Sequence, residues 1–284
     1  MPSTGGKAQA YVSEPSRSSR RWAIEIEIVG IAGQNRGHLA ERTASVMQKE
    51  QGLNEHTLSQ RLERVAANVP ASARLADIGS DHGYLPVALM LRGAIEFAVA
   101  GEVAQTPFHS AQRKVRKNGL EQRIAVRLAD GLAAIEAGDR IDVVSLCGMG
   151  GETMCEIFER GKHYLTGTEQ LIMQPNGGEQ ELRTWLMKNG YRIEHEEVLR
   201  ENRFDYEIIV AVPAADVVYT PQQLLFGPCL MEQRSEAFLG KWRRVLRQRQ
   251  QTLAHFEHAQ EVPQAKARLF SEQVEWITQL LAGA

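Results

Sequence analysis

The chain has 284 residues, of which 43% are hydrophobic and 24% are charged, and its formal net charge is −2. This composition is ordinary for a globular protein, and the length suffices for one large domain or for one domain with a small appendage. The near-neutral charge excludes a surface that is basic throughout, so any contact with nucleic acid must come from a local patch. No stretch approaches the roughly 18 apolar residues of a membrane-spanning helix. Three cysteines without a metal or redox spacing predict reduced thiols and a cytoplasmic protein.

The N-terminal part differs from the rest of the chain, because residues 1–46 are rich in Ser, Gly and Arg. Residues 16–33 faintly resemble a secretion signal, but Glu25 and Glu27 interrupt the apolar part. We therefore predict a disordered extension over residues 1–52, with Met47 as a candidate for the true start of translation.

Hydrophobic periodicity predicts alternating helices and strands from residue 57 onward. A helix over 57–69 ends at Pro70. The predicted strands that follow are 74–78, 96–100, 123–128, 141–146 and 169–174. The predicted helices after these strands are 84–92, 107–118, 151–161 and 178–189. Such alternation is typical of a parallel sheet with helices on both faces.

The turn after the first strand carries the most chemical information. The mostly apolar strand 74–78 contains Asp77 near its end and runs into the sequence GSDHG over residues 79–83. Glycine lets the backbone approach a ligand closely, and the helix that follows directs its N–H groups toward that ligand. The three-glycine phosphate fingerprint is absent, and the carboxylates of Asp77 and Asp81 would repel a pyrophosphate. They suit S-adenosylmethionine (SAM), which has a sulfonium, an ammonium and a ribose diol.

Two further strands, 191–199 and 204–212, are separated by only four residues and predict a closing hairpin. A parallel sheet closed by this hairpin has seven strands, as in SAM-dependent methyltransferases. An NAD-dependent dehydrogenase does not need such a hairpin, so the hairpin favours the methyltransferase. Residues 214–227 predict a linker. Residues 228–284 predict two amphipathic helices, broken at Pro263, that form an antiparallel hairpin or short coiled coil.

Short motifs occur in a characteristic order along residues 53–282. They are LSQRL at 58–62, the stretch 76–86, AGEV at 100–103, DGL at 130–132, GMGG at 148–151, LIMQPN at 171–176 and YEI at 206–208. In this order they resemble the TrmK family of bacterial tRNA (adenine22-N1)-methyltransferases. The chain departs from the family at Gly83, Ala129 and Cys147 and in its N-terminal extension, and none of these departures removes a polar group that the chemistry needs.

The resemblance implies a Rossmann-like, seven-stranded class I SAM methyltransferase domain over 53–213, followed by a C-terminal α-helical hairpin. It also implies SAM as cofactor and N1 of adenine 22 in tRNA as the methyl acceptor. We expect a monomer or weak homodimer without metal. The alternatives are a SAM-dependent methyltransferase of another RNA or of a small molecule, and a non-catalytic RNA-binding protein on the same scaffold.

Polar groups at the strand ends are the candidate site residues. Glu102 follows Gly79 by the roughly 20 residues at which a carboxylate accepts both ribose hydroxyls. Asp130 can accept the amine of the SAM adenine, and Asn176 can hold a target adenine that has been flipped out of the tRNA. Each feature also has a plain structural interpretation as a helix cap, an exposed strand end or a turn. For His82, a neutral side chain that orients Asp81 or contacts SAM is favoured over a general base.

Three sets of residues are thus predicted. The catalytic set is Asp81 and Asn176. The cofactor-binding set is Asp77, Gly79, Ser80, Asp81, His82, Glu102, Val103, Asp130, Gly131, Gly148, Met149 and Gly150. An excess of cations over acids between 234 and 249 favours RNA binding over an ordinary solvated helix face. The RNA-binding set is Arg61, Arg64, Arg234, Lys241, Arg243, Arg244, Arg247 and Arg249.

Overall fold

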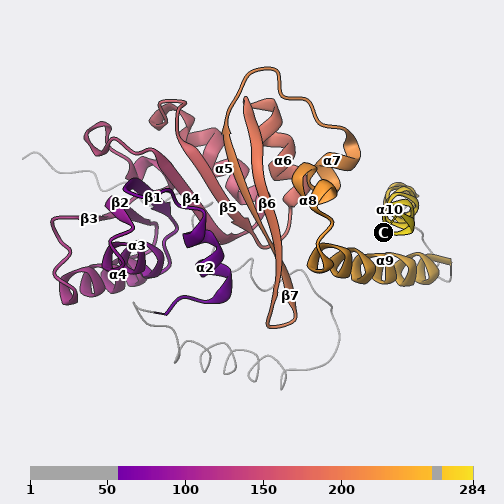
Figure 1. Cartoon of the computed structure of the whole chain (residues 1–284), viewed down its shortest axis with the longest axis horizontal. Helices are drawn as coiled ribbons and strands as arrows, with labels where there is room; N and C mark the ends of the chain where they lie inside the picture. Colours follow the sequence, from indigo (N-terminus) through magenta and orange to yellow (C-terminus); the bar gives the residue numbers. More distant parts are fainter. Residues whose placement is uncertain (1–56, 258–263, 284) are drawn as a thin grey trace, which may run out of the picture. The chain divides into compact units, whose positions relative to one another are not determined.

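The structure is a computed structural model that describes residues 57–257 and 264–283. The predicted N-terminal extension and Met47 lie outside the described residues. One mixed sheet organises the chain, and its strands follow the order β3-β2-β1-β4-β5-β7-β6 (Figure 1). The strands are β1 (Ala73–Ile78), β2 (Ile95–Glu102), β3 (Ile124–Leu128), β4 (Val143–Met149), β5 (Gln170–Pro175), β6 (Tyr191–Glu201) and β7 (Phe204–Pro213).

The first five strands are parallel, and the last two form an antiparallel hairpin that pairs with β5 through β7. This confirms the predicted seven-stranded sheet and its closing hairpin. The central parallel strands are buried on both faces, which explains why they read in the sequence as nearly continuous apolar runs.

Helices cover both faces of the sheet. One apolar core lies under α2 (Gln60–Ala67), α3 (Tyr84–Leu91) and α4 (Gln105–Lys117). The other lies under α5 (Gly151–Gly161) and α6 (Glu179–Lys188). Three short 3₁₀ helices complete this part: η3 (Gly131–Ala134), η4 (Ala137–Asp139) and η5 (Lys162–Tyr164). The predicted helices are confirmed to within a few residues at their ends.

The C-terminal part contains more helices than predicted. The predicted linker includes α7 (Pro221–Phe226), and the chain then forms α8 (Pro228–Gln233), α9 (Glu236–Glu257) and α10 (Gln264–Ala282). The single helix predicted from Pro228 is interrupted because Arg234 adopts a left-handed conformation with φ +46°.

The helices α9 and α10 run antiparallel, as their contacts show. Arg234, just before α9, donates to the Leu280 carbonyl at 2.7 Å, and the ring of Phe256 stacks on that of Phe270. The predicted helical hairpin is therefore confirmed, and its own apolar core packs against Val198 of β6. In the part of the chain that the structure describes, we find no helix with the length and apolar character of a membrane span.

The site is positioned by the direction of the strands. Because β1 to β5 are parallel, their carboxyl ends and the loops that follow them meet at one edge of the sheet. The antiparallel β7 pairs Met173 with Ile209 and Leu171 with Ala211, so its first residues extend beyond the end of β5 at this same edge. Loops from both halves of the chain therefore meet there.

Candidate active site

A cavity of about 380 Å³ lies at the carboxyl edge of the sheet. Its lining residues are Arg61, Leu62, Asp77, Gly79, Ser80, Asp81, Leu85, Cys147, Gly148, Met149, Asn176 and Tyr206. Most of the predicted residues of the first and fourth loops are thus brought together with the predicted Asn176. Glu102, Val103, Asp130 and Gly131 follow the neighbouring strands β2 and β3 and do not line this cavity.

The loop after β1 has an unusual backbone. Gly79, Asp81, His82 and Gly83 all have φ between +48° and +71°. A non-glycine residue in this region costs on the order of 1–3 kcal/mol, and such residues concentrate at functional sites. A Cβ atom at Gly79 would lie 2.9 Å from Met149 Cε and would displace the end of that side chain, and the φ of +68° there favours glycine.

Asp77 fixes the start of this loop. Its buried carboxylate accepts hydrogen bonds from the hydroxyls of Ser80 and Ser145, both at 2.6 Å. Burial raises the pKa of Asp77, while the two hydroxyls oppose that rise by stabilising the ionised form. Asp77 therefore orders the loop, and its predicted contact with the cofactor stays a prediction.

Glu102 is the carboxylate with capacity left for a ligand. It is buried, and its Oε1 accepts the His82 backbone N–H at 3.0 Å, while Oε2 has no partner among the described residues. Burial raises the pKa of Glu102 to about 7. His82 Nδ1 is also buried without a partner in the described part of the chain. The open carboxylate oxygen of Glu102 and the unpartnered His82 Nδ1 fit a ligand that carries hydroxyls, as the ribose of SAM does.

Asp130 lies in a different environment from Glu102. Its carboxylate is exposed and pairs with Arg160 of α5 at 3.0 Å. Gly131 has φ +58°, and a Cβ atom there would lie 3.0 Å from Ile157 Cγ2. Glycine at position 131 therefore allows close packing against Ile157. If Asp130 binds an adenine amine as predicted, its carboxylate must bind that amine and Arg160 together.

The loop after β4 is held in place by the end of β5. Gln174 accepts the Gly148 N–H at 3.1 Å, and the Asn176 side-chain amide donates to the Gly148 carbonyl at 2.7 Å. The Asn176 N–H donates to the Met149 carbonyl at 2.8 Å. Asn176 thus orients backbone groups that line the cavity. Gln174 was not predicted, although a polar residue at the end of a buried strand was a usable signal.

Arg61 lies in the cavity. Its guanidinium donates to Gln174 Oε1 and lies 5.5 Å from the centre of the Tyr206 ring. The carboxylate of Glu201 accepts the N–H groups of Gln60 and Arg61 at the start of α2, and so fixes this helix beside the hairpin. Arg61 was predicted to bind RNA from a surface patch. Tyr206 was missed, although it belongs to one of the motifs.

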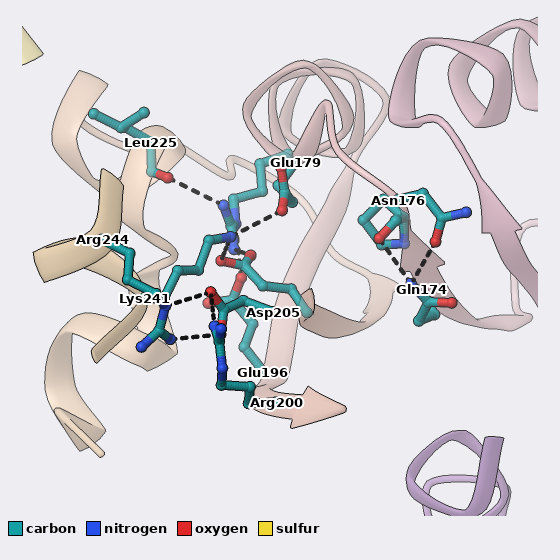
Figure 2. Close-up of polar contacts among 12 residues, drawn as sticks. Gln174, Asn176, Glu179, Glu196, Arg200, Asp205, Leu225, Lys241 and Arg244 are labelled. Atoms are coloured by element: carbon teal, nitrogen blue, oxygen red, sulfur yellow. Dashed lines mark hydrogen bonds and ion pairs between the residues drawn. The ribbon is translucent and has the colours of Figure 1, made fainter. Parts of the chain in front are cut away.

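The cations of the C-terminal helices are less available than predicted. Lys241 has a side chain only 12% exposed and pairs with Glu207 at 2.7 Å and Glu179 at 2.9 Å (Figure 2). Arg244 forms two hydrogen bonds with Asp205. Both side chains attach α9 to the sheet, and their predicted contact with RNA stays a prediction.

The other predicted RNA-binding side chains fall into two groups. Arg234 and Arg249 contact α10, through the Leu280 carbonyl and through Gln273 and the Phe270 ring. Arg64 and Arg243 form exposed ion pairs with Glu197 and Glu236. Arg247 is exposed, and no partner for it occurs within residues 57–257 and 264–283. Arg64, Arg243 and Arg247 are exposed, whereas Arg234, Arg244 and Arg249 are partly buried.

The sheet order, the glycine-rich turn after β1 and the buried acid at the end of β2 together define a class I SAM-dependent methyltransferase. The family model described as tRNA (adenine(22)-N(1))-methyltransferase matches residues 75–279. The chain belongs to this family, TrmK, and the resemblance seen in its motifs is confirmed.

Individual relatives agree with this assignment. The tRNA (adenine(22)-N(1))-methyltransferase of Bacillus subtilis strain 168 is 40% identical over 222 residues, which cover 76% of this chain and 93% of the relative. The crystal structure of the B. subtilis enzyme has a TM-score of 0.74 at 36% identity and covers 80% of this chain and 99% of that one. A putative tRNA (m1A22) methyltransferase from Streptococcus pneumoniae, solved in complex with SAM, has a TM-score of 0.72 at 37% identity and covers 79% and 100%.

Proposed function

We propose that this protein transfers a methyl group from SAM to N1 of adenine 22 in tRNA, within the cavity at the carboxyl edge of the sheet. Membership of the TrmK family supports this reaction. The single structural observation that carries it is the cavity itself, since Gly79, Ser80 and Asp81 of the strained loop and Gly148 of the loop after β4 line the same space.

The residues present fit SAM. Glu102 has a carboxylate oxygen free to accept from the ribose diol, and Asp130 follows the neighbouring strand at the position proposed for the adenine amine. The loop 79–83 offers backbone and the Asp81 carboxylate to the methionine part. SAM, when bound, supplies an electrophilic methyl group.

Adenine N1 has a lone pair in the plane of the ring, so no proton has to leave before it attacks. The product ring is cationic. The protein therefore has to position the base and stabilise positive charge, and it does not need a strong general base. Asp81, whose side chain is 84% exposed beside the cavity, can supply the negative charge. The Gly148 carbonyl, oriented by Asn176, has a second lone pair for the exocyclic amine of the base.

The target base must be flipped out of the folded tRNA, and phosphate contacts offset the cost of a few kcal/mol. We assign part of these contacts to α4, which contains no acidic residue. His109, Arg113 and Arg116 are exposed on this helix, which begins at the same edge of the sheet as the cavity. On α9, the exposed Arg243 and Arg247 contribute a second contact.

Incubation with methyl-labelled SAM and tRNA transcripts tests this function. We expect 1-methyladenosine in digests of a transcript with adenine at position 22 and no label in a matched transcript with guanine there. Label that persists in the guanine transcript would point to another position or another methyltransferase activity. A thermal shift with NAD in place of SAM would support a dehydrogenase.

A further inference from the structure

The hairpin between β6 and β7 ends in an exposed aromatic side chain beside the cavity. Its two turn residues, Asn202 and Arg203, have φ +52° and +74°. Two positive φ values match the twist of a two-residue hairpin, but the second position normally holds glycine, so an arginine there is strained. Phe204, which follows at once, is 59% exposed.

Successive side chains of β7 point to opposite faces of the sheet, so one strand contributes both to the cavity and to the attachment of α9. Ile208 and Val210 pack in the core under α2 and α3, so Phe204 and Tyr206, four and two residues before Ile208, share their face. The intervening Asp205 and Glu207 face the other way, where they bind Arg244 and Lys241 of α9.

The two aromatic rings form a continuous path into the site. Their centres are 6.2 Å apart, and Tyr206 lines the cavity while Phe204 lies outside it. The guanidinium of Arg61 is fixed beside the Tyr206 ring by its bond to Gln174. Flat aromatic faces next to a fixed cation are the elements with which proteins bind unpaired nucleotides.

We propose that Tyr206 and Phe204 form a stacking track for the RNA, with Tyr206 receiving the flipped target adenine and Phe204 a neighbouring unpaired nucleotide. This inference rests on the proposed function and specifies how the same site holds its substrate. The track positions the base, while the Gly148 carbonyl and Asp81 contact its polar atoms. Any base can stack on Phe204, so this position adds affinity and orientation without reading sequence.

Steady-state kinetics of tRNA methylation test the track. Tyr206→Ala and Phe204→Ala should each lower kcat/KM for tRNA by roughly 5- to 100-fold, as expected for the loss of one stacked base. Tyr206→Phe and Phe204→Tyr should stay within about twofold of the wild type, because the aromatic face remains. The matched control is Tyr164→Ala in η5, where an aromatic side chain 40% exposed lies just before β5 and away from the cavity. SAM affinity, measured by calorimetry, should be equal in all five variants.

A second readout is independent of turnover. In a tRNA with the fluorescent base 2-aminopurine at position 22, flipping the base out of the stack raises its fluorescence. This rise should be large on binding to Tyr206→Ala and much smaller on binding to the wild type and to Tyr206→Phe, because stacking on an aromatic ring quenches the flipped base. Alanine variants that behave like Tyr164→Ala in both measurements would overturn the track. Phenylalanine or tyrosine replacements that are as damaging as alanine would also overturn it. A wild-type protein that leaves adenine 22 unmethylated would instead overturn the proposed function, and the track with it.

Discussion

Two buried carboxylates at the ends of adjacent strands differ in how much of their hydrogen-bonding capacity is already used. Asp77 accepts short hydrogen bonds from two hydroxyl groups, whereas Glu102 accepts a single hydrogen bond from a backbone N–H. The oxygen of Glu102 that accepts no hydrogen bond within the described residues is available to a ligand that donates to it. This difference makes Glu102 the residue whose state should change most on cofactor binding.

The raised pKa of Glu102 predicts a pH-dependent affinity for SAM. Because its pKa is about 7, the carboxylate becomes ionised, and a better acceptor for the ribose diol, as pH rises from 6 to 8. We expect the Kd for SAM to fall by roughly tenfold over this range. Calorimetry of Glu102→Gln should show weaker binding without this dependence, and identical pH profiles for the variant and the wild type would contradict the assignment.

The sign of the corresponding effect on stability is opposite. The folded pKa of Glu102 lies above the reference value of 4.5, so its contribution to stability is full below pH 4.5 and is lost as pH rises through about 7. Ligand-free protein should therefore lose this contribution in the same range in which SAM affinity increases.

Asp81 has the side chain best placed to act on charge during the reaction. Asp81→Asn keeps the shape and removes the charge. If Asp81 stabilises the cationic adenine, kcat should fall by roughly 100-fold or more while SAM affinity changes little, since the lost interaction exists mainly in the transition state. A loss of SAM affinity with normal turnover at saturating SAM would instead assign Asp81 to the methionine ammonium.

At the scale of elements, β7 joins the active site to the C-terminal helices. Its Glu207 lies between the buried Arg183 of α6 and Lys241 of α9. Burial by itself favours the neutral amine, but Glu207 and Glu179 raise the pKa of Lys241 above its ordinary value. The neighbour of Glu207 on the strand is Tyr206, so α9 is attached directly behind a residue that lines the cavity.

This network predicts a large loss of stability for Lys241→Met. Removing one member leaves carboxylates buried with less compensation, at a cost near the lower end of about 3–5 kcal/mol because Arg183 still faces Glu207. The matched control Arg247→Met, on the same helix but exposed, should stay within about 0.5 kcal/mol of the wild type. Urea unfolding monitored by circular dichroism measures the free energy of unfolding of each variant. Equal values for Lys241→Met and Arg247→Met would show that the ion pairs of Lys241 do not anchor α9.

The helices and strands that could be predicted from the sequence are those that show a clear hydrophobic periodicity. Buried parallel strands and their helices give long apolar patterns, and glycine at a strand end indicates a close turn. The ion pairs of Lys241 could not be predicted, because an isolated helix shows its own charge and not the carboxylate of Glu207 opposite it. Arg61 and Tyr206, more than 140 residues apart, meet only through the register of β7 beside β5, which no local pattern encodes.

At the scale of the whole described molecule, α4 and α9 both carry exposed cations, Arg113 and Arg116 on α4 and Arg243 and Arg247 on α9. On α4, no acid interrupts the exposed cations, whereas on α9 much of the charge is consumed by Asp205, Glu207 and Glu179. The net charge of −2 therefore conceals a local basic surface near the site.

Charge reversal separates the contributions of the two helices to tRNA binding. The pair Arg113→Glu and Arg116→Glu should weaken binding and reduce the slope of log K against log salt by roughly 1 for each phosphate that the variant no longer neutralises. Arg243→Glu with Arg247→Glu should have a similar or smaller effect, and Arg192→Glu, at the start of β6, should have little. Filter binding across a salt series measures the slopes, and an unchanged slope for the α4 pair would exclude that helix from the tRNA interface.

SAM and the target adenine are proposed to meet in the cavity between the loops after β1 and β4. The most direct test is a crystal structure of the protein with S-adenosylhomocysteine and an RNA hairpin that contains the target adenosine. We expect both ribose hydroxyls to bind the Glu102 carboxylate and the adenine ring to stack on Tyr206 with N1 facing the sulfur. A ribose bound away from Glu102, or a base held outside the cavity, would contradict it.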